Sequence, residues 1–137
     1  MIFMNSDEKL ILAKIIGAMA WADGELHPQE LRQALVQLGH LNLSDVNLEE
    51  MVKNSNKFPW EMDFNKSPIT FQLETMKRCF LVARAHYGMA MTEEAMLRKM
   101  ALQIMPNKPW LQVKKWLELF FTFETETLAV LGTSEYL

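Results

Sequence analysis

The chain has little of what marks a secreted or membrane-spanning protein. Its single cysteine, Cys79, excludes an internal disulfide and fits a reducing compartment. Its first apolar run, residues 10–22, is thirteen residues long and contains Lys14, whereas about 20 apolar residues are needed to cross a bilayer. The first nine residues, MIFMNSDEK, lack the basic flank and the small-residue cleavage site of a signal peptide. We therefore expect a cytoplasmic protein that does not span a membrane.

The chain also lacks an excess of basic residues. It holds 14 Lys and Arg against 17 Asp and Glu, so its formal net charge is −3 and no nucleic-acid partner is indicated. Half of the residues are hydrophobic, which is ordinary for a globular protein. A length of 137 residues suits one domain with a real core, so we expect a single domain over residues 1–137.

Helix signals divide the first part of the chain. Ser6 is a candidate cap for a helix that runs to about Ala22 and stops at Gly24. We expect this helix to be buried, because Lys14 is the only charge in its apolar run. Pro28 begins a second helix, and Gly39 ends it.

The remaining signals are also helical. They predict helices over 45–54, 69–87 and 92–105, and a last helix that opens at Pro109. The segment 55–67 is predicted to be irregular, and the threonines after Phe121 allow a strand-like end. With no convincing run of strands, the predicted fold class is all-α.

A faint internal repeat relates the two halves. Placing Gly24 on Gly88, an offset of 64 residues, also places Glu30 on Glu94. Both copies contain an apolar helix, a glycine stop and a second helix with a glutamate near its start. The repeat predicts two similar helical hairpins packed around a pseudo-two-fold axis.

The segment 12–39, LAKIIGAMAWADGELHPQELRQALVQLG, resembles the opening of the tellurite-resistance TerB-like family. The shared features are an apolar helix that ends in Asp23-Gly24, an apolar residue at Leu26, and Glu30 in the next helix. The resemblance implies a compact all-α domain of two similar helical halves. The second half departs from the family pattern, because Tyr87 stands where an acidic residue is expected.

The resemblance also implies a function. TerB-like domains accompany tellurite-resistance and stress-response systems as non-enzymatic parts of complexes near the inner membrane surface. The resemblance therefore implies that the chain binds protein partners, among which can be a second copy of itself. It also implies peripheral association with the inner membrane. Metal binding by acidic residues is proposed for the family, and here it would involve Asp23, Glu30 and Glu94.

The residues themselves allow a metal site only of a weak kind. The stretch from Asp23 to Glu30 matches the latter part of an EF-hand calcium loop, but the first and third ligand positions would be Met19 and Trp21. Calcium requires six to eight oxygen ligands, so a high-affinity EF-hand is excluded. The alternative is a weak divalent-metal site that uses Asp23, Glu25 or His27, and Glu30.

A structural role is the simpler interpretation of the same corner. Asp23 would accept a backbone hydrogen bond in the turn, and Glu30 would cap the amides of the helix that begins at Pro28. We therefore expect the corner to be structural first, with metal as the alternative and no other cofactor indicated.

Nothing in the sequence favours catalysis. Cys79 lies among apolar residues, which predicts a packed thiol, and His86 is seven residues away on the same predicted helix, about 10.5 Å along its axis. We therefore expect that the protein is not an enzyme. Phe120, Phe121 and Phe123 cannot all point the same way around a helix, so one of them suits an interaction surface.

Overall fold

The computed structural model describes residues 5–39, 47–85 and 89–131, and the side chains of the last range as far as Thr122. These residues form seven helices and no strand, which confirms the all-α class. The helices are α1 (Ser6–Ala20), α2 (Pro28–Leu38), α3 (Leu48–Lys53), α4 (Trp60–Lys66), α5 (Ile69–Ala83), α6 (Met91–Ile104) and α7 (Trp110–Leu131).

Helix α1 is the buried helix that the apolar run predicts. Its inner face and all of its last six residues lie in the core, where α2, α3, α4 and α5 surround it. Lys14 stays exposed, with its ammonium 5.7 Å from the centre of the Phe58 ring. The cap is Asn5 and not Ser6: Asn5 Oδ1 accepts the Glu8 N–H at 2.8 Å, and Glu8 Oε1 accepts the Asn5 N–H at 3.1 Å. This reciprocal pair satisfies two amides that a serine cap alone would leave open.

Glycine lets α1 approach α3 closely. A Cβ on Gly17 would lie 2.6 Å from the Cβ and from the Oγ of Ser55, so no larger residue fits without a shift. Ser55 Oγ in turn donates to the Met51 carbonyl at 2.6 Å. The close contact fixes α1 and α3 side by side, directly before the corner that leads to α2.

Two predictions about secondary structure are wrong. The segment 55–67 is not all irregular, because it contains α4, whose Phe64 is fully buried and whose end is held by a Ser67 hydroxyl donating to the Asp63 carbonyl. The chain after Phe121 is not strand-like, since α7 continues to Leu131. A β-branched residue costs a helix less than about 0.7 kcal/mol, so threonines spaced among Glu, Phe and Leu do not end it.

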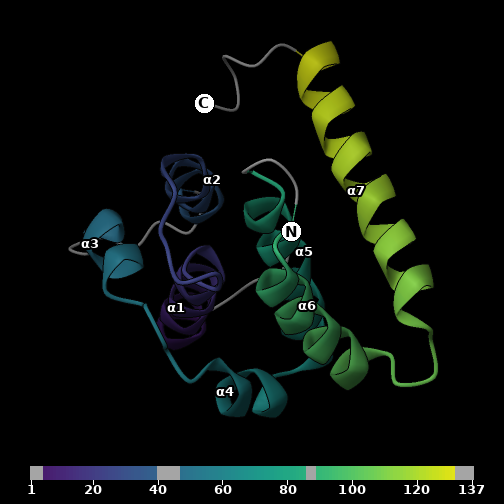
Figure 1. Cartoon of the computed structure of the whole chain (residues 1–137), viewed down its shortest axis with the longest axis horizontal. Coiled ribbons are helices and arrows are strands. Elements are labelled where there is room, and N and C mark those ends of the chain that lie inside the picture. Colours follow the sequence, from purple (N-terminus) through teal and green to yellow (C-terminus); the bar gives the residue numbers. More distant parts are fainter. Residues whose placement is uncertain (1–4, 40–46, 86–88, 132–137) are drawn as a thin grey trace.

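Figure 1 shows three groups of helices across the molecule, with α4 at one end. α1, α2 and α3 form one side, α5 and α6 the middle, and α7 runs along the opposite side, packed on α5 and α6. α1 and α5 each have 15 residues, and three helix boundaries are displaced by 63 residues: 6 to 69, 20 to 83 and 28 to 91. α5 ends at Ala83, earlier than the predicted 87.

No helix in the described part of the chain combines the length and the apolar character needed to cross a membrane.

Candidate metal site between two helical corners

The α1–α2 corner is built around a glycine. α1 ends at Ala20, and Gly24 has a φ of +89°, the left-handed conformation that the sequence predicts for it. Gly24 N–H donates to the Trp21 carbonyl at 2.8 Å, and the Trp21 indole N–H donates to the Val52 carbonyl at 2.9 Å. The turn is thereby tied to α3, and the side chains that follow it are held in place.

Asp23 serves the backbone as predicted, but only with one of its oxygens. Asp23 Oδ1 accepts the Glu25 N–H at 3.0 Å, while Oδ2 lies 3.0 Å from His27 Nε2. The Asp23 carboxylate therefore closes the turn and also contacts His27, the residue immediately before α2.

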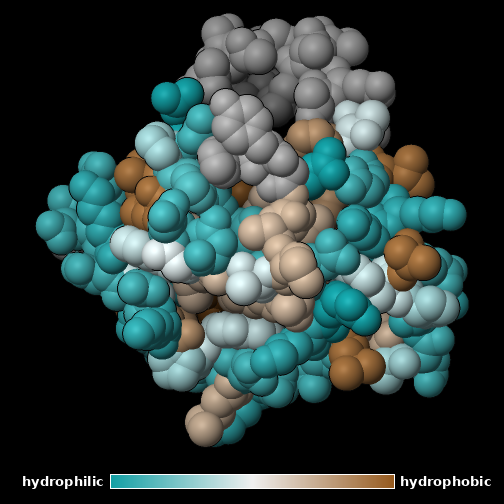
Figure 2. Space-filling view, in the orientation of Figure 1, coloured by the Kyte–Doolittle hydropathy of each residue, from teal (hydrophilic) through white to brown (hydrophobic). Residues whose placement is uncertain are grey.

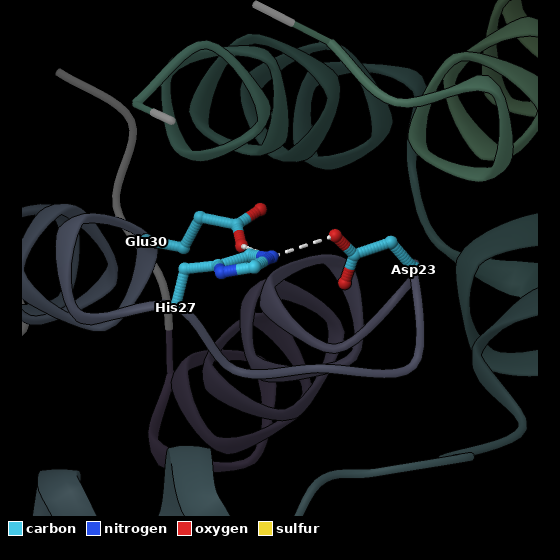
Figure 3. Close-up of side chains that lie close together, drawn as sticks. All are labelled: Asp23, His27 and Glu30. Atoms are coloured by element: carbon cyan, nitrogen blue, oxygen red, sulfur yellow. Dashed lines mark hydrogen bonds and ion pairs between the residues drawn. The ribbon is translucent and has the colours of Figure 1, made fainter. Parts of the chain in front are cut away.

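Acidic side chains of the corner lie around the His27 ring (Figure 3). His27 occupies the N-cap position of α2, and its Nε2 atom lies 3.0 Å from Asp23, 3.7 Å from Glu25 and 3.9 Å from Glu30. Asp23 and Glu30 approach the ring from different elements, the turn and the first turn of α2. A single ring nitrogen therefore lies at the meeting point of the corner's carboxylates.

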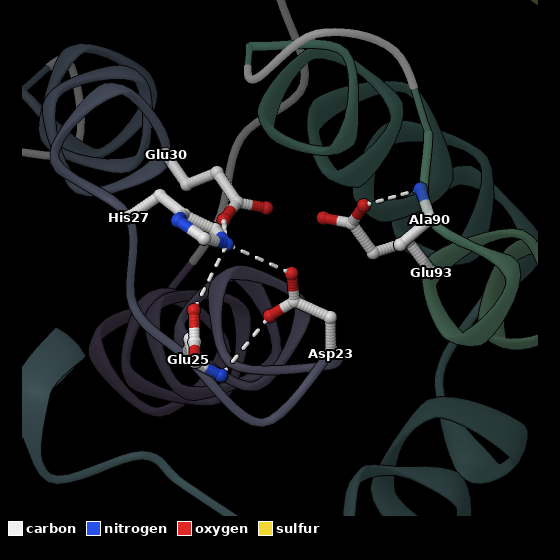
Figure 4. Close-up of polar contacts among 6 residues, drawn as sticks. All are labelled: Asp23, Glu25, His27, Glu30, Ala90 and Glu93. Atoms are coloured by element: carbon white, nitrogen blue, oxygen red, sulfur yellow. Dashed lines mark hydrogen bonds and ion pairs between the residues drawn. The ribbon is translucent and has the colours of Figure 1, made fainter.

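Glu30 does not form a regular capping box with α2: burial raises the pKa of Glu30 and the His27 backbone partly offsets this rise, but no hydrogen bond of good geometry joins Glu30 to that backbone. Its side chain is 1% exposed, and neither Oε1 nor Oε2 has a hydrogen-bond partner. The residue stands at the third position of α2, after Pro28, which has no N–H to cap. Its carboxyl group points away from its own helix amides, toward α6 (Figure 4).

Glu93 meets Glu30 from the other half of the molecule. It is 2% exposed and stands at the third position of α6, the position that Glu30 has in α2. Its Oε1 accepts the Ala90 N–H at 2.8 Å, while its Oε2 is buried without a partner. In Figure 4 the free oxygens of Glu30 and Glu93 point toward each other.

Sequence reasoning chose Glu94 instead of Glu93 as the acidic partner in the second half. Glu94 faces α7, where it accepts the Trp110 indole N–H at 2.9 Å and the Lys114 ammonium at 3.2 Å. These contacts, the tryptophan hydrogen bond first, lower the pKa of Glu94. One residue along a helix turns a side chain by about 100°, so the choice of neighbour decides the face. An offset of 63 instead of 64 would have identified Glu93.

The buried carboxyl groups raise one another's energy when both are charged. Burial is the main reason why the pKa of Glu30 rises to about 9, and contact with Glu93 and the charge of Asp23 raise it further. At neutral pH the pocket therefore needs a positive charge, which either a proton on Glu30 or a bound cation would supply.

The donor atoms are spaced for a small cation. One ligand atom from each of Asp23, His27 and Glu30 lies within 4.8 Å of the others. Metal–ligand bonds of about 2.0–2.2 Å place neighbouring ligand atoms roughly 3.0–3.4 Å apart, so small side-chain rotations would close the site. Glu93 Oε2 lies across from this group on α6 and is not one of the three atoms that lie this close together.

The other residues with reactive groups lie elsewhere. Cys79 is fully buried in the core, as a packed thiol should be, and burial raises its pKa well above the usual range of a thiol. His86, Tyr87 and Gly88 fall outside the described residues, so the predicted departure at Tyr87 lies there as well.

Comparison with known proteins gives no relative. No family model, no curated protein and no solved structure matches this chain.

Proposed function

We propose that this protein is a non-enzymatic domain that binds one divalent transition-metal cation between Asp23, His27, Glu30 and Glu93. The observation that supports it is the pair of buried carboxylates, Glu30 and Glu93: one Glu30 oxygen lies beside the His27 ring, and the other faces the free oxygen of Glu93. Native proteins satisfy nearly all buried polar groups, and an unoccupied ion site is one reason for an exception. These oxygens are why we prefer a ligand role for Glu30 to the backbone role that its sequence position suggests.

The donor set favours particular ions. One imidazole and three carboxylates suit Mn²⁺, Fe²⁺ or Zn²⁺, whereas Ca²⁺ needs six to eight oxygen atoms. A Mn²⁺ or Zn²⁺ ion would be held from the turn, from α2 and from α6 together, with Glu25 at the exposed rim of the site. His27 would bind through its Nε2 lone pair, while Glu93 would keep its Oε1 bond to the Ala90 amide.

Titration calorimetry of the chelator-treated protein tests the proposal. We expect one Mn²⁺ or Zn²⁺ ion to bind per chain, and Ca²⁺ and Mg²⁺ to bind at least about tenfold more weakly. For Mn²⁺, the electron paramagnetic resonance signal of the free ion should decrease as the site fills. The variants Asp23→Asn and Glu93→Gln should each weaken binding at least tenfold, because each removes a charged ligand.

Glu94→Gln is the matched control. It changes the neighbour of Glu93 by the same chemistry, but its side chain contacts Trp110 and Lys114 on α7. The control should bind metal as the parent does. A parent protein that binds none of these ions, or a Glu94→Gln variant that loses binding as Glu93→Gln does, would contradict the proposal.

We also propose that the chain is a TerB-like domain made of two related helical hairpins, α1–α2 and α5–α6. The equal lengths of α1 and α5, the shared 63-residue displacement and the like positions of Glu30 and Glu93 support this relationship. Superposing residues 6–38 on 69–101 tests it: equivalent Cα atoms should overlay with the two glutamates on the same helix turn. A superposition that fails over both helices would contradict it.

The TerB-like resemblance further supports a cytoplasmic role in a bacterial stress or tellurite-resistance system, with protein partners. Deletion of the gene in its own host should then increase sensitivity to tellurite or to another stress, and a copy that carries Glu93→Gln should fail to restore growth. Restoration by that copy would separate the cellular role from the metal site.

A further inference from the structure

A second region of the molecule has the opposite charge from the corner. Residues 98–116 contain five basic residues and no acidic one, although the whole chain has more acidic residues than basic ones. The basic residues are Arg98, Lys99, Lys108, Lys114 and Lys115. This stretch covers the second half of α6, the turn after it and the first two turns of α7.

Part of this positive charge is not neutralised. Lys114 pairs with Glu94 at 3.2 Å, and Lys99 lies 3.3 Å from Glu61. Arg98, Lys108 and Lys115 form no ion pair with any residue whose side chain the structure describes. Unpaired cations on an exposed surface attract an anionic group and accelerate its association.

Two hollows meet at Lys108. One has a volume of about 430 Å³ and lies between Arg98, Leu102 and Trp110, while the other, of about 300 Å³, lies between Leu73, Val113 and Trp116. Lys108 lines both. The turn that presents it follows Pro106 and is closed by the Lys108 N–H donating to the Met105 carbonyl at 3.1 Å.

Large apolar side chains are exposed on α6 and α7, and two of them line the hollows: Leu102 one and Trp116 the other. Leu102, Leu111 and Leu119 are 66%, 71% and 69% exposed, and Trp116 is 40% exposed. Figure 2 shows hydrophobic residues breaking the hydrophilic surface along the edge where α7 lies. Exposed apolar side chains next to unpaired positive charges are typical of a protein-binding site.

We propose that this surface, the α6–α7 patch (Arg98, Leu102, Lys108, Leu111 and Trp116), binds an acidic amphipathic segment of another protein. A carboxylate of the segment pairs with Lys108, and apolar side chains on either side of that carboxylate enter the two hollows. Separate hollows fit individual side chains, whereas a lipid surface needs a continuous convex apolar face. The patch lies on the far side of α6 from the Glu30–Glu93 site, so the proposal does not depend on metal binding.

Selection from a phage-displayed library of random 12-residue peptides tests the proposal. Peptides enriched on the parent protein should contain at least two Asp or Glu residues next to Leu, Phe or Trp. Fluorescence anisotropy with a labelled enriched peptide should show binding that weakens at least about fivefold between 50 and 500 mM NaCl. Amide shifts in nuclear magnetic resonance spectra should be confined to residues 98–119 and to the adjoining part of α5.

Substitutions in the α6–α7 patch test whether the peptide binds there. Lys108→Glu should weaken the peptide at least tenfold, and Trp116→Ala should do the same by emptying one hollow. Lys66→Glu, a reversal of another exposed lysine at the end of α4, should leave binding unchanged. Circular dichroism should show that all three variants keep their helix content.

Three results would overturn the proposal. One is a library that enriches no acidic peptide, or peptides that bind Lys108→Glu as well as the parent. Another is cosedimentation with phosphatidylglycerol vesicles, lost in Lys108→Glu, without peptide binding, which would assign the patch to a lipid surface. The third is a doubled mass in sedimentation that Lys108→Glu abolishes, which would assign the patch to a second copy of the chain.

Discussion

The first turns of α2 and α6 place the same residue type at the same position with different results. Glu30 and Glu93 are both third residues of their helices, and both are buried. Glu93 bonds the amide of the residue before its helix, whereas Glu30 makes no such hydrogen bond of good geometry and faces Glu93. A glutamate at this position usually completes a cap. The comparison shows that α6 uses its glutamate for local structure, whereas α2 has a glutamate available for a ligand.

The preceding corner explains the difference. The α1–α2 corner has Asp23 to hold the turn and His27 at the cap position, so its polar groups gather around the His27 ring. In α6 the cap position is Ala90, whose side chain offers no acceptor, and the capping contact is the Ala90 N–H donating to Glu93 Oε1. The third residue of each helix is a glutamate, but its role differs because the N-cap residue three places before it differs: His27 in α2 and Ala90 in α6.

The largest expected effect is the stabilisation of the protein by a metal ion, because two glutamates that only capped their helices would not respond to metal. At a free Mn²⁺ or Zn²⁺ concentration of 100 times Kd, the parent should gain about 2.7 kcal/mol in free energy of unfolding. The double variant Asp23→Asn with Glu30→Gln should gain almost nothing. Thermal unfolding with and without the ion measures both.

The Glu94→Gln protein should keep the full gain, because that side chain faces α7. If the double variant melts lower than the parent while neither protein responds to metal, the corner has only a structural role.

The next effect concerns pH in the metal-free protein. Because the folded-state pKa of Glu30 is raised to about 9, the folded protein holds a proton there that the unfolded chain releases near its ordinary value of 4.5. This contribution to stability is complete below pH 4.5 and is lost as the pH rises toward 9. Glu30→Gln removes the ionisable group, so the variant should gain stability relative to the parent as the pH rises.

The relative gain should reach about 2 kcal/mol between pH 5 and pH 8, which is half of the limit of roughly 1.4 kcal/mol per pH unit. Urea unfolding of both chelator-treated proteins at several pH values measures it. A difference in free energy that stays constant with pH would mean that Glu30 titrates alike in the folded and unfolded states.

The glycine of the first corner provides a smaller effect. Gly24→Val should destabilise the protein by about 1–2 kcal/mol, because a β-branched residue is strained at a φ of +89°. No atom lies within 4 Å of where a Cβ would be, so a clash does not contribute. Gly24→Asn, which tolerates this conformation, should lose clearly less. Equal melting temperatures for the Val variant and the parent would contradict the corner geometry.

Local signals in the sequence were sufficient for most helices but not for the site. Pro28, Gly24 and the apolar spacing of residues 10–21 act within a few residues, and the helices they predict are present. α4 was missed because its stability depends on one buried ring, Phe64, and that burial is tertiary. Asp23, His27 and Glu30 lie within one turn, so their proximity could be predicted.

The partner from α6 could not be predicted in the same way. Choosing between Glu93 and Glu94 needs the start of α6 to within one residue, and helix boundaries are uncertain by that much from sequence alone. Ala90 gives no capping signal, so the sequence does not fix this start. The burial of Glu30 without a partner also depends on α6, which is 60 residues farther along the chain.

The smallest expected effect is the loss of stability when the hydrogen bond from the Ala90 N–H to Glu93 is removed. Glu93→Ala removes the acceptor of the Ala90 N–H, and the loss of such a cap costs about 1 kcal/mol. Glu93→Gln keeps an acceptor oxygen and removes the charge that faces Glu30, so it should be at least as stable as the metal-free parent. Urea unfolding of the chelator-treated variants should therefore place Ala about 1 kcal/mol below Gln. If the two variants unfold alike, the Glu93 hydrogen bond contributes nothing to α6, and the contrast between the two glutamates disappears.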